Sequence, residues 1–536
     1  MSFELIDQYI ARGDYADALK LARETRALDP ANLDAVFYLT KAEFASGNLA
    51  RATELVEQLA ATSANNSAVF HLLRGNIFAA RQMLPDAASA FEAAIKRDPN
   101  QAAAFLNLGM VRRQLGDVDG ARIALAQATV LTPNAMVAWT ELGHLHRATG
   151  AVIDAEKCFE RALTLDANVA ATWVAIGNLF AETFKFPRAK QSFERALTLD
   201  ADNEPARSTL GFVLAEMGET SAAQSILATT PSSLPRRVRS LLLLPQIYNS
   251  AEDLQYWRKR YGDGLDALQN ISVDSEEIWK IAQSNFLLAY QGQHDRELQE
   301  KYAGFLRRQI AQHRPDLLTT PKRDFTRKRI RVVFVSSFFR ECTVGHYFRS
   351  WITDLDAQKF ERIVIHTGWQ PDAFGVALQQ QCDQFMVARG GVLQTAELIR
   401  SLAADIVIYP EVGMGTMNYW LTNMRLAPTQ IAAWGHPVTT GSCEMDYFFT
   451  CAAMEPYDAA AHYTERLIML PGIGTRYAMP TAVTTNITRE SLNLRSDSHL
   501  YICPQSLFKI HPDNDAIYID IMARKLAASM RGKNFI

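Results

Sequence analysis

The chain has 536 residues, of which 48% are hydrophobic and 21% are charged, and its formal net charge is −3 at pH 7. Single hydrophobic cores stop growing well short of this length, so we expect a globular protein of several domains. The nearly balanced charge excludes a strong field for nucleic acid or for a membrane surface, and no apolar run has the length of a signal-peptide core or a membrane span.

Residues 1–230 carry an internal repeat. Alanines recur with spacings of 34, 35, 34, 34, 34 and 34 residues, at Ala18, Ala52, Ala87, Ala121, Ala155, Ala189 and Ala223. Two further phases are marked by glycines, at Gly13, Gly47, Gly116, Gly150 and Gly218, and at Gly75, Gly109, Gly143, Gly177 and Gly211. We predict about seven units, each a pair of amphipathic helices packed closely at these small residues.

One such unit cannot bury its own apolar face, so the units are predicted to stack into a superhelix with a concave groove. The motifs resemble the tetratricopeptide repeat. Arrays of this kind bind peptides or proteins, and the alternatives are a spacer or a surface for homodimerisation. The repeats alone do not choose between these functions.

Residues 231–325 are predicted to be a helical connector without the repeat phase. It ends in PKRDFTRKRIR, a basic run that either binds an anionic ligand or, as we expect, is a solvated linker between domains.

The pattern of apolar residues changes near residue 326. β-branched and apolar runs such as RIRVVFVSS, DIVIYPE and QIAAWG alternate with helix-like stretches, which predicts a parallel sheet covered by helices on both faces. Ligands of such sheets lie beyond the carboxyl ends of the strands. The loops VSSFFRECTVGH, YPEVGMG and GHPVTTGS are therefore the places to search for a site.

The cysteines are scattered and form no CxxC pair; they are Cys158, Cys342, Cys382, Cys443, Cys451 and Cys503. We therefore expect no disulfide framework and no zinc site, and a reduced cytoplasmic setting fits best.

Five motifs occur in order behind the repeats: VSSFFRECTVGHYF, DIVIYPEVGMG, MRLAPTQIAAWGHPVTTGSCEMDYF, HYTERLIMLPG and CPQSLFKIHPDND. In this order they resemble the SPINDLY-like O-linked N-acetylglucosamine transferase family, which is similar in turn to bacterial N-glucosyltransferases that modify adhesins. The resemblance implies a cytoplasmic enzyme that transfers a sugar from a UDP-sugar to protein side chains, without a catalytic metal or other cofactor. The repeats would recruit the acceptor protein.

The resemblance also implies a GT-B fold, in which two Rossmann-like domains face a cleft. On this basis residues 326–485 are the first of these domains, and residues 486–536 are the start of the second, donor-binding domain. The fold class is thus an α-solenoid of tetratricopeptide repeats followed by an α/β GT-B region.

Two residues carry the implied chemistry. Lys509 matches the family lysine that meets the UDP phosphates, where a cation neutralises the charge that develops on the leaving diphosphate. The alternative is a surface lysine near a helix start. His436, in GHPVTTGS, is placed to orient the acceptor or the sugar and to move a proton near neutral pH, or else its ring only braces the turn.

Further residues are implied with less definite roles. His346 aligns with a family histidine near the end of the first strand, and Gln505 and Ser506 are expected on the donor side with Lys509. Thr439 and Thr440 either hydrogen-bond sugar hydroxyls or cap their own turn. Glu411, at another strand end, has no assigned role.

The chain departs from the eukaryotic members of this family at several positions. Cys342 stands where they have a cleft histidine, and a mostly protonated thiol is a poor substitute base. Phe508 replaces a tyrosine before the phosphate lysine. The asparagine ladder that clamps peptides in the groove is matched by Asn107, but the same phase then holds Glu141, Ala175 and Thr209.

The largest departure is at the end of the chain. A second Rossmann-like domain needs on the order of a hundred residues, and only about one βα unit follows Leu500. The uridine-binding His-Thr-Thr-Gly-like stretch of the family is absent. We therefore expect a truncated donor domain and weak or absent UDP-sugar binding. The alternative from another functional class is a noncatalytic repeat scaffold that binds partner proteins.

Overall fold

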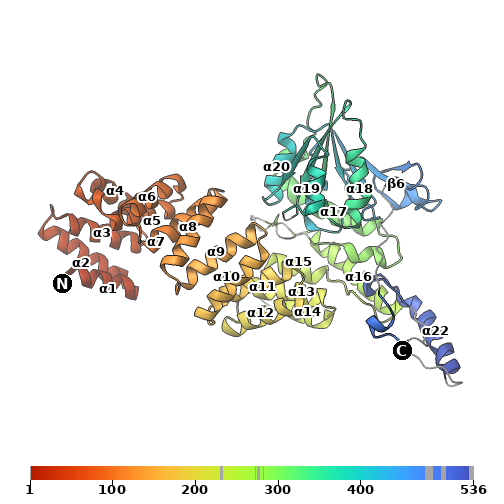
Figure 1. The fold of residues 1–536 in the computed structure, drawn as a ribbon, viewed down its shortest axis with the longest axis horizontal. Coiled ribbons are helices and arrows are strands. Elements are labelled where there is room, and N and C mark those ends of the chain that lie inside the picture. The colour runs from red at the N-terminus through yellow and green to blue at the C-terminus, as the bar shows by residue number, and fades with distance from the viewer. Residues whose placement is uncertain are drawn as a thin grey trace. The chain divides into compact units, whose positions relative to one another are not determined.

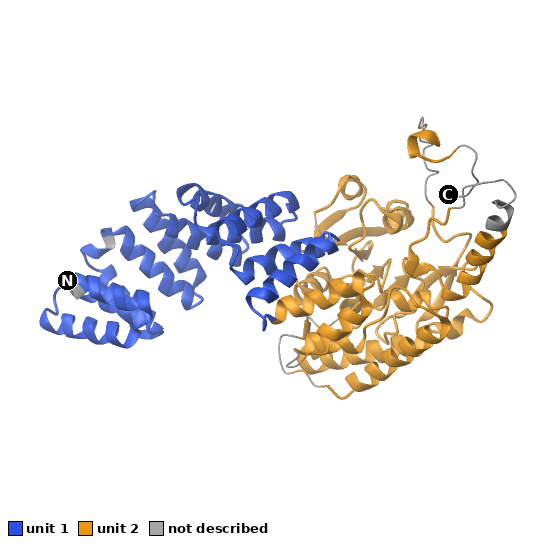
Figure 2. Cartoon of the chain, turned by 90° about the horizontal axis from the view of Figure 1, so that it is seen from below, with its two compact units in different colours: residues 1–203 blue, residues 204–536 orange. Residues whose placement is uncertain are grey.

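The computed structural model describes residues 2–529 except 230–232, 272, 274–277, 280, 282, 369, 477–486 and 496–501. The chain forms two compact units, residues 1–203 and 204–536 (Figure 2). None of the described helices combines the length and the apolar character needed to cross a bilayer.

The first unit consists of antiparallel helix pairs (Figure 1). Its helices are α1 (Ser2–Arg12), α2 (Tyr15–Leu28), α3 (Leu33–Ala45), α4 (Leu49–Ala60), η1 (Ser63–Asn66), α5 (Ala68–Ala80), α6 (Leu84–Arg97), α7 (Ala102–Gln114), α8 (Val118–Leu131), α9 (Met136–Ala148), α10 (Val152–Leu165), α11 (Ala170–Glu182) and α12 (Phe186–Leu199). The predicted repeat solenoid is confirmed.

Close contact between the paired helices explains one of the glycine phases. A Cβ added at Gly75 would lie 2.4 Å from Cε1 of Phe91, and one added at Gly143 would lie 2.7 Å from Cε1 of Phe159. Both phenylalanines are fully buried. Each glycine therefore lets the aromatic ring of the second helix rest directly on the backbone of the first helix.

The other glycine phase occupies the turn inside each pair. These five glycines have φ values between 77° and 83°, a left-handed conformation that an L side chain rarely adopts. Two units place other residues in this turn, Gln82 with φ 60° and Phe184 with φ 58°. The period survives there at a cost in backbone strain.

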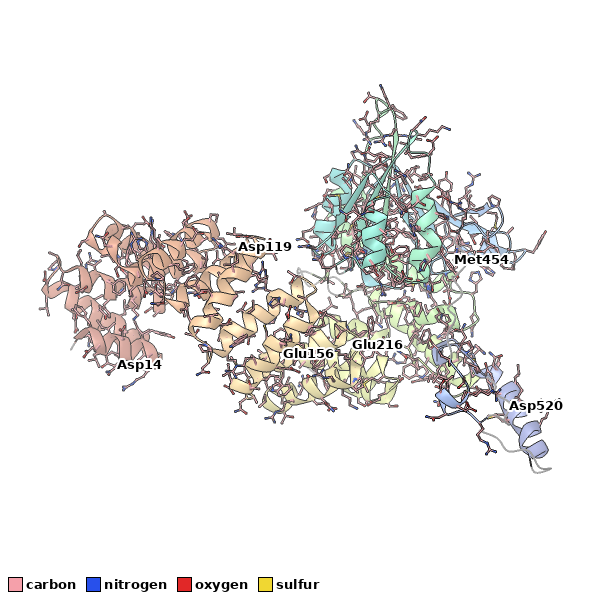
Figure 3. All side chains as sticks on the ribbon, viewed as in Figure 1. Asp14, Asp119, Glu156, Glu216, Met454 and Asp520 are labelled. Atoms are coloured by element: carbon pink, nitrogen blue, oxygen red, sulfur yellow. The ribbon has the colours of Figure 1, made fainter. Side chains whose placement is uncertain are left out.

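Polar contacts also join successive repeats. Glu156 on α10, labelled in Figure 3, pairs with Lys185 at 2.8 Å and with Arg188. Glu141 stands at one of the groove positions where the expected asparagine is replaced, and it forms an ion pair with Arg113 at 3.1 Å. Asn107 Nδ2 donates to Asn76 Oδ1 at 2.7 Å.

The second unit begins with the last helix pair of the repeat pattern, α13 (Glu204–Glu216) and α14 (Thr220–Leu227). The predicted array boundary at residue 230 falls outside the described residues. The segment that follows contains α15 (Leu234–Leu241), α16 (Ala251–Leu268), η3 (Phe286–Tyr290), α17 (Arg296–His313) and η4 (Pro315–Leu318).

The predicted parallel sheet is confirmed. Its strands are β1 (Ile330–Ser336), β2 (Phe360–His366), β3 (Gln384–Val387), β4 (Ile406–Tyr409), β5 (Thr429–Ala433), β6 (Tyr447–Cys451) and β7 (Arg466–Leu470). They pair in the order β3-β2-β1-β4-β5-β6-β7, all parallel. The strand order reverses between β1 and β4, where Val333 faces Val407 in register.

Four helices connect the strands: α18 (Thr343–Thr353), α19 (Ala373–Gln379), α20 (Val392–Ser401) and α21 (Thr416–Thr422). One sheet face packs against α18 and α19 through Ile352, Phe374 and Leu378. The basic run before β1 is tied to the amino end of the sheet, because Arg323 and Arg327 both pair with the buried carboxylate of Asp405.

Beyond β7 the described residues form η6 (Glu490–Leu492), η7 (Leu507–Lys509), η8 (Pro512–Asn514) and α22 (Asp515–Ser529). The predicted boundary at residues 485 and 486 and the predicted strand near Leu500 lie outside the described residues.

Candidate functional site

Polar side chains gather at the carboxyl edge of the sheet, at the point where the strand order reverses. Ser336 ends β1, Glu411 follows β4, and His436 follows β5. All three are buried, with exposed fractions of at most 2%. Open parallel sheets bind ligands at this position, so these side chains form the candidate site.

His436 is a buried imidazole with one uncommitted nitrogen. Burial lowers its pKa to about 4, which makes the ring neutral at physiological pH. Nε2 has no hydrogen-bond partner among the described residues. A buried polar atom without a partner is unusual in a folded protein, which makes this nitrogen a candidate for a functional role.

The His436 ring lies between the connector and the turn after β4. The ring of Phe286 lies 5.2 Å from it, centroid to centroid. A Cβ added at Gly413 would come within 2.4 Å of His436 Cδ2 and 3.0 Å of Nε2. Only glycine permits this approach, and its φ of 119° also requires glycine.

Lys509 lies near the same part of the molecule because it contacts a residue of η3. Its ammonium lies 5.5 Å from the ring centroid of Tyr290 and 5.9 Å from that of Phe508. The Phe508 ring lies 5.7 Å from Phe286, which itself contacts His436. The two predicted residues, far apart in the sequence, therefore gather around one short segment of the connector.

The connector residues Phe286 and Tyr290 were missed by sequence reasoning. They occur in the run FLLAYQG, whose apolar character predicts only burial. Neighbouring Asn285, fully buried, fixes the segment: it accepts a hydrogen bond from Tyr261 at 2.5 Å and donates to Gln299 at 3.2 Å. No local signal marks these rings, because their partners are set by tertiary contacts.

Thr439 and Thr440 are placed inside the loop. Thr439 Oγ1 donates to Glu465 Oε2 at 2.6 Å, and Thr440 donates to Oε1 of the same carboxylate through its hydroxyl and, at 2.8 Å, its backbone N–H. Both threonines are buried. Within the loop, Thr439 Oγ1 also accepts the Gly441 N–H at 3.2 Å, and Thr440 Oγ1 accepts the Ser442 N–H at 3.1 Å. A Cβ added at Gly441 would lie 2.2 Å from the backbone carbon of Gln299, so the loop packs directly on α17.

His346 lies elsewhere on the edge, in the first turn of α18. Its Nε2 lies 2.7 Å from Glu341 Oε1, and its ring packs edge-on against Phe374 with centroids 5.2 Å apart. Cys342 occupies the N-cap position of the same helix without a side-chain capping bond, and its thiol donates to the Phe338 carbonyl. Neither residue contacts His436 in the described part of the chain.

Gln505 and Ser506 are exposed and precede Lys509. The Ser506 carbonyl accepts the Lys509 backbone N–H at 2.9 Å, which closes the turn of η7. Within the described residues, no group of three or more His, Cys, Asp or Glu side chains is arranged to hold a metal ion.

Glu411 has the most strongly perturbed carboxyl of this edge. Burial raises its pKa to about 8, although Ser336 and Asn418 donate hydrogen bonds that act in the opposite direction. Perturbed ionisable groups concentrate at functional sites, although structural networks also contain them.

Two family models match the chain. Residues 5–236 match a tetratricopeptide-repeat model described as the C-terminal domain of cilia and flagella-associated protein 70, and residues 286–481 match glycosyl transferase family 41. The second match begins at Phe286, so it includes η3 and α17 as well as the sheet. The chain is thus a repeat region followed by a region similar to glycosyl transferase family 41.

Two curated relatives are UDP-glucose:protein N-beta-glucosyltransferases of Actinobacillus pleuropneumoniae. The serotype 7 protein is 34% identical over 110 residues, which are 20% of this chain and 17% of the relative. The serotype 5b protein is 29% identical over 162 residues, which are 29% of this chain and 25% of the relative. The matches therefore span a quarter or less of these relatives.

Among solved structures, a mutant of the Thermobaculum terrenum O-GlcNAc transferase has 19% sequence identity and a TM-score of 0.36. The match covers 71% of this chain and 59% of that chain.

Proposed function

We propose that the chain is a UDP-sugar-dependent protein glycosyltransferase. The observation that carries this proposal is the buried, neutral imidazole of His436, with its unpartnered Nε2, inside the region that matches glycosyl transferase family 41. A neutral imidazole nitrogen accepts a hydrogen bond from an attacking hydroxyl or amide, whose proton must leave during transfer of the sugar.

The residues around η3 have complementary roles in this proposal. His436 Nε2 accepts the proton of the acceptor group. The Lys509 ammonium neutralises charge that develops on the diphosphate leaving group, and Phe286, Tyr290 and Phe508 hold the two groups around one segment. Gln505 and Ser506 contribute on the donor side, and His346 acts from the first turn of α18, after β1. Thr439 and Thr440 act on the sugar indirectly, by shaping the loop.

We propose that the acceptor is a protein recruited by the repeats. We also propose that the transfer reaction uses no metal and no other cofactor. The donor is a UDP-sugar that carries N-acetylglucosamine or another hexose. The proposed location of the protein is the cytoplasm.

The test is direct. The chain is incubated with UDP-N-acetylglucosamine and separately with UDP-glucose, with peptide pools containing Ser, Thr and Asn, and products are mapped by mass spectrometry. We expect weak transfer that is lost in His436→Ala and retained in His313→Ala, a control whose ring contacts the Val273 carbonyl at the end of α17.

The second candidate is the noncatalytic scaffold, and the extent of the repeat array favours it. Absence of transfer with both donors, together with capture of the same partner protein by the parent chain and by His436→Ala, would support the scaffold and refute the enzyme.

A further inference from the structure

Glu411 ties three elements together at the reversal of the strand order. Its Oε1 accepts a hydrogen bond from Ser336 Oγ at 3.0 Å, across from β4 to β1. Its Oε2 accepts from Asn418 Nδ2 at 2.6 Å, and the same amide donates to the Glu411 carbonyl at 2.8 Å. The carboxyl therefore anchors the turn after β4 to β1 and to α21.

That turn, residues 410–413, contacts His436 in two ways. The Pro410 carbonyl accepts the N–H of Gly435, the residue before His436, at 2.9 Å. A Cβ added at Gly435 would lie 2.5 Å from this carbonyl oxygen and 2.9 Å from Glu411 Cβ, so the two backbones are in direct contact. Gly413 lies against the imidazole itself.

The connector holds the far end of the same turn. Ser284 Oγ donates to the Gly413 carbonyl at 2.6 Å, and Ser284 lies two residues before Phe286, whose ring contacts His436. The position of the imidazole thus depends on a turn with two side-chain ties, Glu411 at its start and Ser284 at its end.

We propose that Glu411 is a positioning residue for His436: its carboxyl holds the 410–413 turn against the imidazole, so that Nε2 stays directed at the acceptor. This inference rests on the proposed function for its kinetic consequence, and on geometry alone for its effect on the ring. It assigns a role to a residue that the motif comparison left without one.

Asp405 provides a matched control. Asp405 lies directly before the first residue of β4 and is 4% exposed. Its carboxylate accepts a hydrogen bond from the Arg331 N–H at 2.8 Å and forms ion pairs with Arg323 and Arg327. It is a buried, well-bonded carboxylate on the same strand, yet it contacts nothing near His436. A general loss of strand stability would therefore appear in both variants.

The test compares Glu411→Ala, Glu411→Gln, Ser336→Ala and Asp405→Asn in the full chain. The His436 ring signal is followed by NMR on histidine-labelled protein and assigned by its absence in His436→Asn. We expect Glu411→Ala to shift this signal and to lower kcat roughly a hundredfold, because misplacement by about 1 Å costs that much. KM for the UDP-sugar should change by less than about twofold, since Lys509 does not touch the turn.

Glu411→Gln should restore the ring signal and most of kcat, because its amide can donate to Ser336 Oγ and accept from Asn418. Asp405→Asn should leave both unchanged. An unshifted His436 signal in Glu411→Ala, or an equal shift in Asp405→Asn, would overturn the proposal. So would a Glu411→Gln variant as impaired as the alanine variant.

If Glu411→Ala does not fold, Ser336→Ala decides, because it removes one of the ties and leaves the carboxyl in place. It should shift the ring signal in the same direction by a smaller amount, and an unchanged signal would overturn the proposal. If the parent chain transfers no sugar, the proposed function fails, while the NMR comparison still tests the positioning role.

Discussion

The repeat array and the α/β region achieve burial in different ways. In the repeats each helix packs on its neighbours in sequence, and the same few contacts recur, such as Gly75 with Phe91 and Gly143 with Phe159. In the sheet β1 pairs with β4, and the Arg331 N–H bonds to Asp405, 74 positions further along the chain. The first pattern is local and periodic, whereas the second depends on contacts between distant segments.

The difference has a consequence for function. A repeat array distributes its stability over equivalent interfaces, so a change in one unit is felt mainly by its neighbours. The carboxyl edge of the sheet concentrates unusual groups in one place: His436 without a partner for Nε2, Glu411 with a raised pKa, and Gly413 with positive φ. Four measurements would sharpen or break this contrast.

The largest effect is expected at His436. His436→Ala should lower the rate of sugar transfer roughly 100- to 10,000-fold, as loss of a positioned proton acceptor does. Hydrogen exchange in the repeat helices should stay unchanged. A variant that keeps the parent rate would show that the ring only braces its turn.

The matching change in the repeats is Phe159→Ala. It removes a fully buried ring from the surface of Gly143 and should cost about 3–5 kcal/mol of local stability. Hydrogen-exchange mass spectrometry should locate faster exchange in α9, α10 and the adjoining helices. Equal loss of protection in the sheet would contradict the local character of the array.

Glu411 should make the stability of the α/β region depend on pH. Its pKa rises from 4.5 to about 8 on folding, so the folded state binds more protons than the unfolded state between these values. The stability that this group contributes is therefore full below pH 4.5 and is lost as pH rises to about 8, on the order of a few kcal/mol. Hydrogen exchange of β1 and β4 from pH 5 to 8 measures the slope, and Glu411→Gln should flatten it. An equal slope in that variant would assign the pH dependence to another group.

The smallest effect concerns Phe184, which is 76% exposed and has a φ of 58°. Phe184→Gly should stabilise the α11–α12 pair by about 1 kcal/mol, because glycine adopts this conformation without strain. Ala148→Gly, at the last residue of α9, is a control that should destabilise its own helix slightly, because glycine costs less at a helix end than in its interior. Thermal melting of the two variants gives the comparison, and a destabilised Phe184→Gly would mean that the exposed ring makes a contact worth more than the strain.

The candidate site was only partly predictable. His436 and Lys509 could be named from motifs, since each lies in a short stretch that carries its own signal. Their meeting around Phe286 and Tyr290 could not be predicted, because these rings belong to a connector whose letters indicate only an apolar segment. The sequence allowed Thr439 and Thr440 either to bind sugar hydroxyls or to cap their own turn. Only the position of Glu465 reveals where their hydroxyls point.

By itself, the sequence determined the repeat array and the alternation of strands with helices, although β3 was not predicted, because periodic small residues and apolar runs act over one helix pair or one strand. Tertiary structure alone decided three further features. These are the strand order, the burial that lowers the pKa of His436 and raises that of Glu411, and the turn that places Gly413 against the imidazole. Each of these depends on which distant segments exclude water from a polar group, and desolvation is a property of the packed environment rather than of the residue.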